Sequence, residues 1–170
     1  MCPPRVVSGG YRARTLHPAR TLHHCPDAPH YPEFVSAEGP SIVVSGVVVR
    51  NRAGQLLTVR KRGTQRFMLP GGKPEPGESA VDAAVRECAE EVGLHVAAAD
   101  LQTVGVFHTI AANEPGHGLV ASVYAYPTPV HTVSASAEID EVRWLDPDAA
   151  LPDDLAPLLV EHVIPICKHR

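Results

Sequence analysis

The alternation of apolar and polar residues predicts a series of short elements from residue 40 onward. Runs that predict strands lie at Ile42–Arg50, Gln55–Arg60, Leu101–Ala111, Leu119–Tyr126 and Ile139–Leu145. The turn NRAG at 51–54 predicts that the first two strands form a hairpin. Helical periodicity predicts one helix at 80–92 and another at 155–164 that ends at Pro165. Strands on both sides of a central helix, followed by a C-terminal helix, predict an α/β fold with a mixed sheet between helices.

The helix at 80–92 is marked at both ends. Ser79 and Asp82 have the spacing of a capping box, and Gly93 lies where helices commonly end in a left-handed residue. The apolar positions of this helix form a single stripe with the spacing of a buried face: Val81, Ala84, Val85, Cys88 and Val92. This stripe predicts which side of the helix faces the core.

Three carboxylates are predicted to lie together on the side away from that stripe. Glu87, Glu90 and Glu91 are related as i, i+3 and i+4, so they share one patch in the last two turns. The helix dipole disfavours each of these charges by about 0.3–1 kcal/mol. Two explanations are open: a solvated acidic face, or a divalent cation site, because carboxylate oxygens are natural ligands of Mg²⁺ and Mn²⁺.

The spacing of the surrounding residues favours the cation site. The stretch 72–94 fits the pattern G-x5-E-x7-R-E-U-x-E-E-x-G-U at Gly72, Glu78, Arg86, Glu87, Glu90, Glu91, Gly93 and Leu94. This pattern is the Nudix box, and the domain resembles a MutT-like Nudix hydrolase; only Cys88 departs from the larger aliphatic residue that is usual there. The resemblance implies an α/β/α sandwich with a loop-helix-loop catalytic motif. It also implies metal-dependent hydrolysis of a nucleoside diphosphate linked to another moiety.

The resemblance assigns roles within the box. It implies that Glu87, Glu90 and Glu91 bind Mg²⁺, with Mn²⁺ as the alternative metal, and that one of them also serves as the base. Glu78 would support the site and Arg86 would orient Glu87. The segment EIDEVRWL at 138–145 resembles the one that carries a further acid in MutT-type members, with Glu141 as the first candidate metal ligand and Glu138 as the second. A solvated edge strand is the alternative for these two acids.

Substrate contacts are predicted on either side of the loop that precedes the box. Gly71 and Gly72 permit a tight loop that approaches phosphates closely, and Lys73 follows directly. Arg60 and Arg62 belong to the only dense basic cluster and are placed on the same side of their strand, so they are candidate phosphate or base contacts. A solvent-exposed hairpin end is the alternative. His108 and Asn113 are expected near the mouth of the sheet, where a structural role is favoured.

In the family that the box indicates, residues outside the box determine the substrate. The positions that would carry a proline in ADP-ribose hydrolases or a tyrosine in dinucleoside polyphosphate hydrolases are Thr109, Ile110 and Ala111, so neither signature is present. Elimination leaves a nucleoside triphosphate, canonical or oxidised, as the predicted substrate. The alternatives are ADP-ribose or another nucleotide conjugate, or a Nudix domain that binds nucleotides as a sensor without catalysis.

Composition and charge agree with a small-molecule enzyme. The chain has 170 residues, 44% of them apolar, which suits one domain with a substantial core. The net charge of −4 arises within 71–94, and the remaining acids and bases balance, whereas a binder of nucleic-acid polymers would normally show a basic excess. There is no apolar run of membrane-spanning length, and the four scattered cysteines favour a cytoplasmic location. A monomer or homodimer is expected.

Residues 1–39 differ in composition from the rest of the chain. They are rich in proline, histidine and arginine, show little apolar periodicity, and contain the near-repeat ARTLHP and ARTLHH. They are predicted to form a disordered extension that precedes the Nudix domain at 40–170. A metal clip built from their histidines and cysteines is the alternative, although none of them has the paired spacing of a zinc site.

Overall fold

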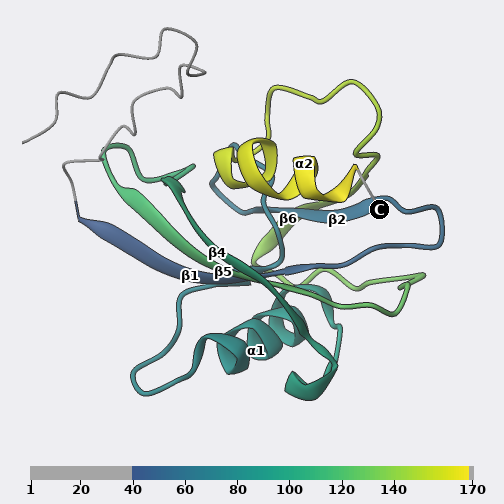
Figure 1. The fold of residues 1–170 in the computed structure, drawn as a ribbon, viewed down its shortest axis with the longest axis horizontal. Coiled ribbons are helices and arrows are strands. Elements are labelled where there is room, and N and C mark those ends of the chain that lie inside the picture. Colours follow the sequence, from purple (N-terminus) through teal and green to yellow (C-terminus); the bar gives the residue numbers. More distant parts are fainter. Residues whose placement is uncertain (1–39, 169–170) are drawn as a thin grey trace, which may run out of the picture. The chain divides into compact units, whose positions relative to one another are not determined.

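The computed structural model describes residues 40–168 (Figure 1). The predictions made for residues 1–39, both the extension and the metal clip, lie outside the described residues. The strands are β1 (Ser41–Val48), β2 (Leu56–Lys61), β3 (Gly71–Gly72), β4 (Gln102–Ile110), β5 (Gly118–Ala125) and β6 (Ile139–Leu145). The helices are α1 (Ala80–Val92) and α2 (Ile164–Cys167), with a 3₁₀ turn at Ala98–Asp100 and a π-helical turn at Leu159–Val163. Within 40–168, no helix is both long and apolar enough to cross a bilayer.

The strands form two sheets. The larger sheet has the order β3-β1-β5-β4, in which β1 and β5 run parallel and the other pairs antiparallel, so the predicted mixed sheet is confirmed. The predicted hairpin of the first two strands forms only beside its turn, where the Leu57 N–H donates to the Val49 carbonyl and the Asn51 N–H to the Gln55 carbonyl. The prediction is wrong for the rest of β2, which pairs along its length with β6. Strand β1 has β3 on one side and β5 on the other, so β2 meets only the residues that follow β1, through an antiparallel bridge between Arg50 and Leu56.

Helix α1 lies on one side of the sheets and the C-terminal helical segment on the other (Figure 1). Strand alternation supplies both cores: Val47 and Val49 pack in the cluster with α1, whereas Val48 packs in the cluster with the C-terminal segment. The same division holds in β2, where Leu57 and Leu56 belong to opposite clusters. The predicted α/β/α sandwich is therefore confirmed.

The C-terminal helical segment runs past the proline that was predicted to end it. The π-helical turn leads directly into α2, which contains Pro165 and ends at Cys167. The Ile164 N–H donates to the Leu159 carbonyl, five residues earlier. A proline ring collides with the carbonyl four residues before it in a regular α-helix, and a wider turn relieves that crowding. The prediction of an end at Pro165 is wrong for this reason.

Candidate functional site

Helix α1 has the ends that its sequence predicts. The Ser79 hydroxyl accepts a hydrogen bond from the Asp82 N–H at 3.2 Å and caps the first turn. At the other end Gly93 has a φ of 65°, and its N–H donates to the Ala89 carbonyl. Cys88 is fully buried in the core against α1, which fits the apolar position that it holds in the box. The caps set where the helix begins and ends, and its buried face sets the direction in which its carboxylates point.

The three carboxylates of the box do not share one solvated face. Glu90 is 60% exposed, whereas Glu91 is only 1% exposed and lies with Ala84 and Cys88 on the buried side. The physical reason is helical geometry: seven residues make almost two full turns, so Glu91 falls close to the direction of Ala84. The prediction that all three lie away from the apolar stripe is wrong for Glu91.

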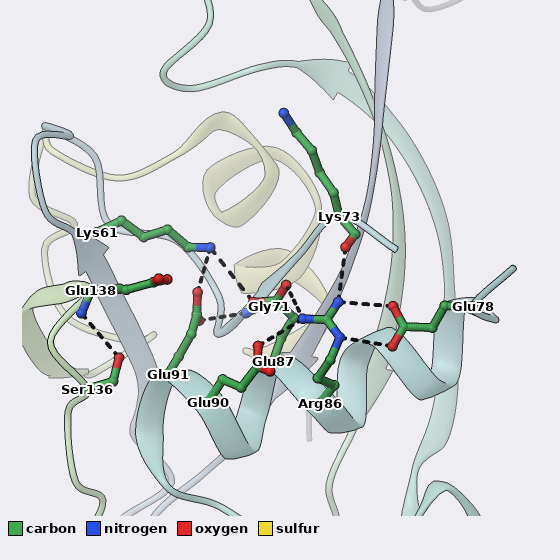
Figure 2. A network of polar contacts seen from close by, with 10 residues as sticks. All are labelled: Lys61, Gly71, Lys73, Glu78, Arg86, Glu87, Glu90, Glu91, Ser136 and Glu138. Carbon is green, nitrogen blue, oxygen red and sulfur yellow. Dashed lines mark hydrogen bonds and ion pairs between the residues drawn. The ribbon is translucent and has the colours of Figure 1, made fainter. Parts of the chain in front are cut away.

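Buried Glu91 is held by two donors from other parts of the chain. One carboxylate oxygen accepts the Gly71 N–H at 2.9 Å, and the other lies 2.6 Å from the Lys61 ammonium (Figure 2). Burial raises the pKa of Glu91, while its contacts with Lys61 and Gly71 act in the opposite direction. Burial alone would lower the pKa of Lys61, but the attraction of Glu91, Glu87 and Glu138 outweighs it and leaves that pKa raised.

Arg86 ties the other acids of the site together. Its guanidinium donates two hydrogen bonds of 3.0 Å to Glu78, and one of 2.9 Å to each of Glu87 and Glu90. It also donates to the Lys73 carbonyl, so it links the helix to the preceding loop (Figure 2). The bonds from Arg86 lower the pKa of Glu78, and the acids around Arg86, with Glu78 first, raise the pKa of the guanidinium. The predicted contact between Arg86 and Glu87 is present.

The glycine pair packs against strand β1 at Gly71 and against helix α1 at Gly72 more closely than any side chain would allow. A Cβ atom on Gly72 would overlap the Glu87 carboxylate, and one on Gly71 would overlap the Ser45 carbonyl. Gly71 also has a φ of 153°, which residues with a side chain rarely adopt. The loop therefore needs glycine at both positions to bring its backbone to Glu87 and Glu91.

A cavity of about 460 Å³ opens beside this loop. Its polar lining includes Lys61, Lys73, Arg86 and Glu87. Its apolar lining comes from β1, β5, the segment before β3 and the C-terminal helical segment: Ile42, Val44, Met68, Leu119, Leu158 and Leu159. Asn113 is part of the lining and His108 is not, so the structure separates the two residues that were expected near the mouth of the sheet.

Lys61, and not its two neighbours, reaches the site. Arg60 pairs with Asp140 at 2.7 Å and with Glu141 at 3.0 Å, and neither Arg60 nor Arg62 lines the cavity. Sequence reasoning missed Lys61, although a signal existed: it follows Val59 by two residues, and Val59 packs in the core against α1. The substrate contacts of Arg60 and Arg62 stay predictions that this placement does not support.

Glu141, the first candidate for a further metal ligand from outside the box, does not point toward the box carboxylates but pairs with two arginines. Glu141 pairs with Arg60 and lies 3.6 Å from Arg143, because it stands opposite Arg60 in the β2–β6 ladder. Glu138 instead points toward Lys61 and Glu91 (Figure 2). Glu138 is the residue directly before β6. The structure therefore favours Glu138 over Glu141 as the acid that this part of the chain brings to the site.

The NUDIX domain profile matches residues 40–163. The chain belongs to the NUDIX family. It is 34% identical over 108 residues to a MutT-like protein from Streptomyces ambofaciens, covering 64% of this chain and 65% of that protein. It is 32% identical over 101 residues to a putative 8-oxo-dGTP diphosphatase from Bacillus subtilis strain 168, covering 59% and 64% respectively. These relatives place the chain in the MutT-like branch, although it matches slightly less than two thirds of the length of either.

A solved structure supports the same assignment. The MutT protein from Methanosarcina mazei Go1 superposes with a TM-score of 0.56 at 25% sequence identity, covering 69% of this chain and 88% of that one. The NUDIX fold of this chain therefore follows from both its sequence and its architecture.

Nudix hydrolases generally use divalent metals, and the oxygen atoms of this site fit such an ion chemically. The nearby donors are carboxylates, which suit a hard cation such as Mg²⁺ or Mn²⁺. Among the described residues, no group of three or more acidic, histidine or cysteine side chains is arranged to bind a metal ion. Arg86 and Lys61 explain this, since their charged nitrogens contact the carboxylate oxygens of Glu87, Glu90 and Glu91. Metal binding by Glu87, Glu90 and Glu91 stays a prediction, and it requires these contacts to rearrange.

Proposed function

We propose that this chain hydrolyses a phosphoanhydride bond in a nucleotide-derived substrate with a bound divalent cation, Mg²⁺ or Mn²⁺. The observation that carries the proposal is the position of Glu87 and Glu91 beside the backbone of Gly71 and Gly72, where Glu87 and both glycines line a largely apolar cavity. A pyrophosphate requires cations and close backbone approach, and a nucleobase requires an apolar surface. Glu87, the backbone of Gly71 and Gly72, and the apolar walls lie together in one cavity, which supports the proposal.

The chain's own residues divide the work of positioning. Gly71 and Lys61 hold Glu91, and Arg86, itself held by Glu78, orients Glu87. The bound cation supplies neutralisation of phosphate charge and orientation of the attacking water. One of the box glutamates accepts the proton of that water while the new O–P bond forms and the bridging P–O bond breaks.

The proposed substrate class is a nucleoside triphosphate, canonical or oxidised. The cavity has apolar walls for a base and the amide of Asn113 for its hydrogen-bonding edge, and Lys73 stands at the loop for phosphate. The relative that is described as a putative 8-oxo-dGTP diphosphatase supports the same class. We also propose a cytoplasmic location, in line with the scattered cysteines, and a monomer or homodimer that binds neither nucleic-acid polymers nor membranes.

A substrate panel with Mg²⁺ tests the proposal. It should contain canonical and oxidised nucleoside triphosphates, ADP-ribose, nucleotide sugars, dinucleoside polyphosphates and coenzyme A, with products identified by chromatography and mass. We expect a nucleoside triphosphate to give the fastest turnover, with nucleoside monophosphate and pyrophosphate as products. Fastest turnover of ADP-ribose or another conjugate would reassign the substrate. Tight nucleotide binding without turnover of any compound would identify a sensor.

A further inference from the structure

Among the described residues, Lys61 is the nearest charged partner of one oxygen of Glu91 and of one oxygen of Glu87. Glu91 uses one oxygen to accept the Gly71 N–H, and the other lies 2.6 Å from the Lys61 ammonium. Glu87 uses one oxygen to accept from Arg86, and the other lies 4.0 Å from the same ammonium (Figure 2). Lys61 therefore stands between the oxygens of Glu87 and Glu91 that remain for a cation.

The approach of Lys61 is independent of the helix that carries the acids. Lys61 ends β2, where the ladder with β6 shifts register between Arg60 and Lys61, and its side chain is 29% exposed on the wall of the cavity. Glu138, whose carboxylate lies near that of Glu91, adds a third negative charge close to the ammonium (Figure 2). A lysine has a flexible four-carbon stem, so its charged end can leave this position while the strand stays in place.

We propose that Lys61 is a tethered cation that occupies the place of a divalent metal ion in the metal-free protein and withdraws when the metal binds. This inference rests on the proposed function, because it concerns the same carboxylates. In the metal-free protein Lys61 offsets the repulsion between Glu87 and Glu91, and its ion pair with Glu91 holds that buried side chain in place. On withdrawal, the ammonium remains on the cavity wall, within the space where substrate phosphates bind.

The proposal makes Lys61 a competitor of the metal. A metal that binds only the state from which Lys61 has withdrawn shows an apparent affinity reduced by the population of that state. Replacement of Lys61 by glutamine removes the competitor, so Mn²⁺ should bind about tenfold more tightly if the open state is about a tenth populated. The same replacement should lower the thermal midpoint of the metal-free protein, since Glu91 loses its ion pair.

Titration with Mn²⁺ alone, followed by paramagnetic resonance of the free ion, measures this affinity without any turnover. Lys61→Gln should bind Mn²⁺ about tenfold more tightly than the wild type, while Arg62→Gln, which removes an equal charge from the adjacent position, should change the affinity by less than about twofold. Equal or weaker binding by Lys61→Gln would overturn the proposal, as would equal tightening by Arg62→Gln.

A second measurement on the wild-type protein covers the case in which Lys61→Gln fails to fold. An amine-modifying reagent, with modification of each lysine quantified by mass spectrometry, should label Lys61 slowly in the metal-free protein and several-fold faster with saturating Mg²⁺. Unchanged or slower labelling with Mg²⁺ would contradict withdrawal. The two proposals fail separately: Mn²⁺ tightening without any hydrolysis would sink the proposed function alone, and hydrolysis without Mn²⁺ tightening would sink only the role of Lys61. Absence of metal binding in both proteins would overturn both.

Discussion

The ammonium of Lys61 lies 2.6 Å from the carboxylate of Glu91, which is the most buried acid of helix α1. The two residues come from different layers of the sandwich, since Lys61 ends a strand and Glu91 occupies the last turn of the helix. Their contact ties β2 to the carboxylates of the box. It also gives Glu91 an ion pair that its position on the helix alone does not predict.

Glu91 and Glu90 should therefore differ in their effect on stability. Glu91→Gln removes the closest ion pair of the partly buried Lys61 ammonium and should destabilise the metal-free protein by about 1–3 kcal/mol. Glu90→Gln changes an exposed side chain and should stay within about 0.5 kcal/mol of the wild type. Urea unfolding in the presence of a chelator measures both. Equal stability of the two variants would contradict the assigned contact between Lys61 and Glu91.

A side chain on Gly72 should impair catalysis by displacing the Glu87 carboxylate. Gly72→Ala places a methyl group where the Glu87 carboxylate lies, so it should lower kcat/KM by about 100-fold while the protein still folds. Gly54→Ala serves as the control, because Gly54 has a φ of 81° in a distant turn with open space around it. That control should lose about 1 kcal/mol of stability and keep its activity. Full activity of Gly72→Ala would show that the close approach to Glu87 is unnecessary.

Arg86 should require its planar guanidinium and not only its charge. Arg86→Lys keeps the positive charge but cannot contact Glu78, Glu87 and Glu90 at once, so kcat/KM should fall about 10–100-fold. Arg52→Lys makes the same exchange at an exposed turn and should have no measurable effect. Steady-state kinetics on the best substrate compare the two. A wild-type rate for Arg86→Lys would rule out the positioning role.

Low pH should destabilise the protein by breaking the ion pair between Arg143 and Asp154, neither of which lines the cavity. Arg143 donates two hydrogen bonds to Asp154, of 2.9 and 3.0 Å, and these hold the pKa of Asp154 below its usual value. A depressed pKa in the folded state adds stability above the unfolded pKa of about 3.9. That stability is lost as the pH falls from there through the lower folded pKa. Asp154→Asn should lower the thermal midpoint at pH 7 and lose less between pH 5 and pH 2.5 than the wild type.

The matched control for that experiment is Asp148→Asn, which changes an exposed acid near the same end of β6. It should retain the wild-type dependence on pH. Parallel curves for the wild type and Asp154→Asn would show that the pair with Arg143 does not contribute to acid unfolding.

The box helix could be read from sequence because its signals are local. Ser79 and Gly93 set its ends through contacts within a few residues, and the spacing of the box fixed which acids belong together. The burial of Glu91 could have been derived from its seven-residue separation from Ala84, but a grouping based only on neighbouring acids overlooked it.

The remaining errors concern contacts between distant segments. The pairing of β2 with β6 depends on which strands already flank β1, and no pattern within residues 42–60 contains that information. The same pairing sets Glu141 opposite Arg60 and leaves Glu138 to face Lys61. The continuation of the last helical segment past Pro165 required a π-helical turn, which the apolar periodicity does not reveal. The residues of the box and the ends of its helix were therefore predictable from the sequence. The pairing and register of the strands, and the ion pairs that depend on them, required the three-dimensional structure.

The central claim is that the box carboxylates support metal-dependent hydrolysis of a nucleoside triphosphate. The most direct test is to incubate the wild-type protein with the best nucleoside triphosphate of the panel, with Mg²⁺ or with a chelator, and to compare it with Glu90→Gln. We expect nucleoside monophosphate and pyrophosphate only with Mg²⁺, and a kcat at least 100-fold lower for Glu90→Gln. Turnover that persists with the chelator, or that is equal in the wild type and Glu90→Gln, would contradict the account.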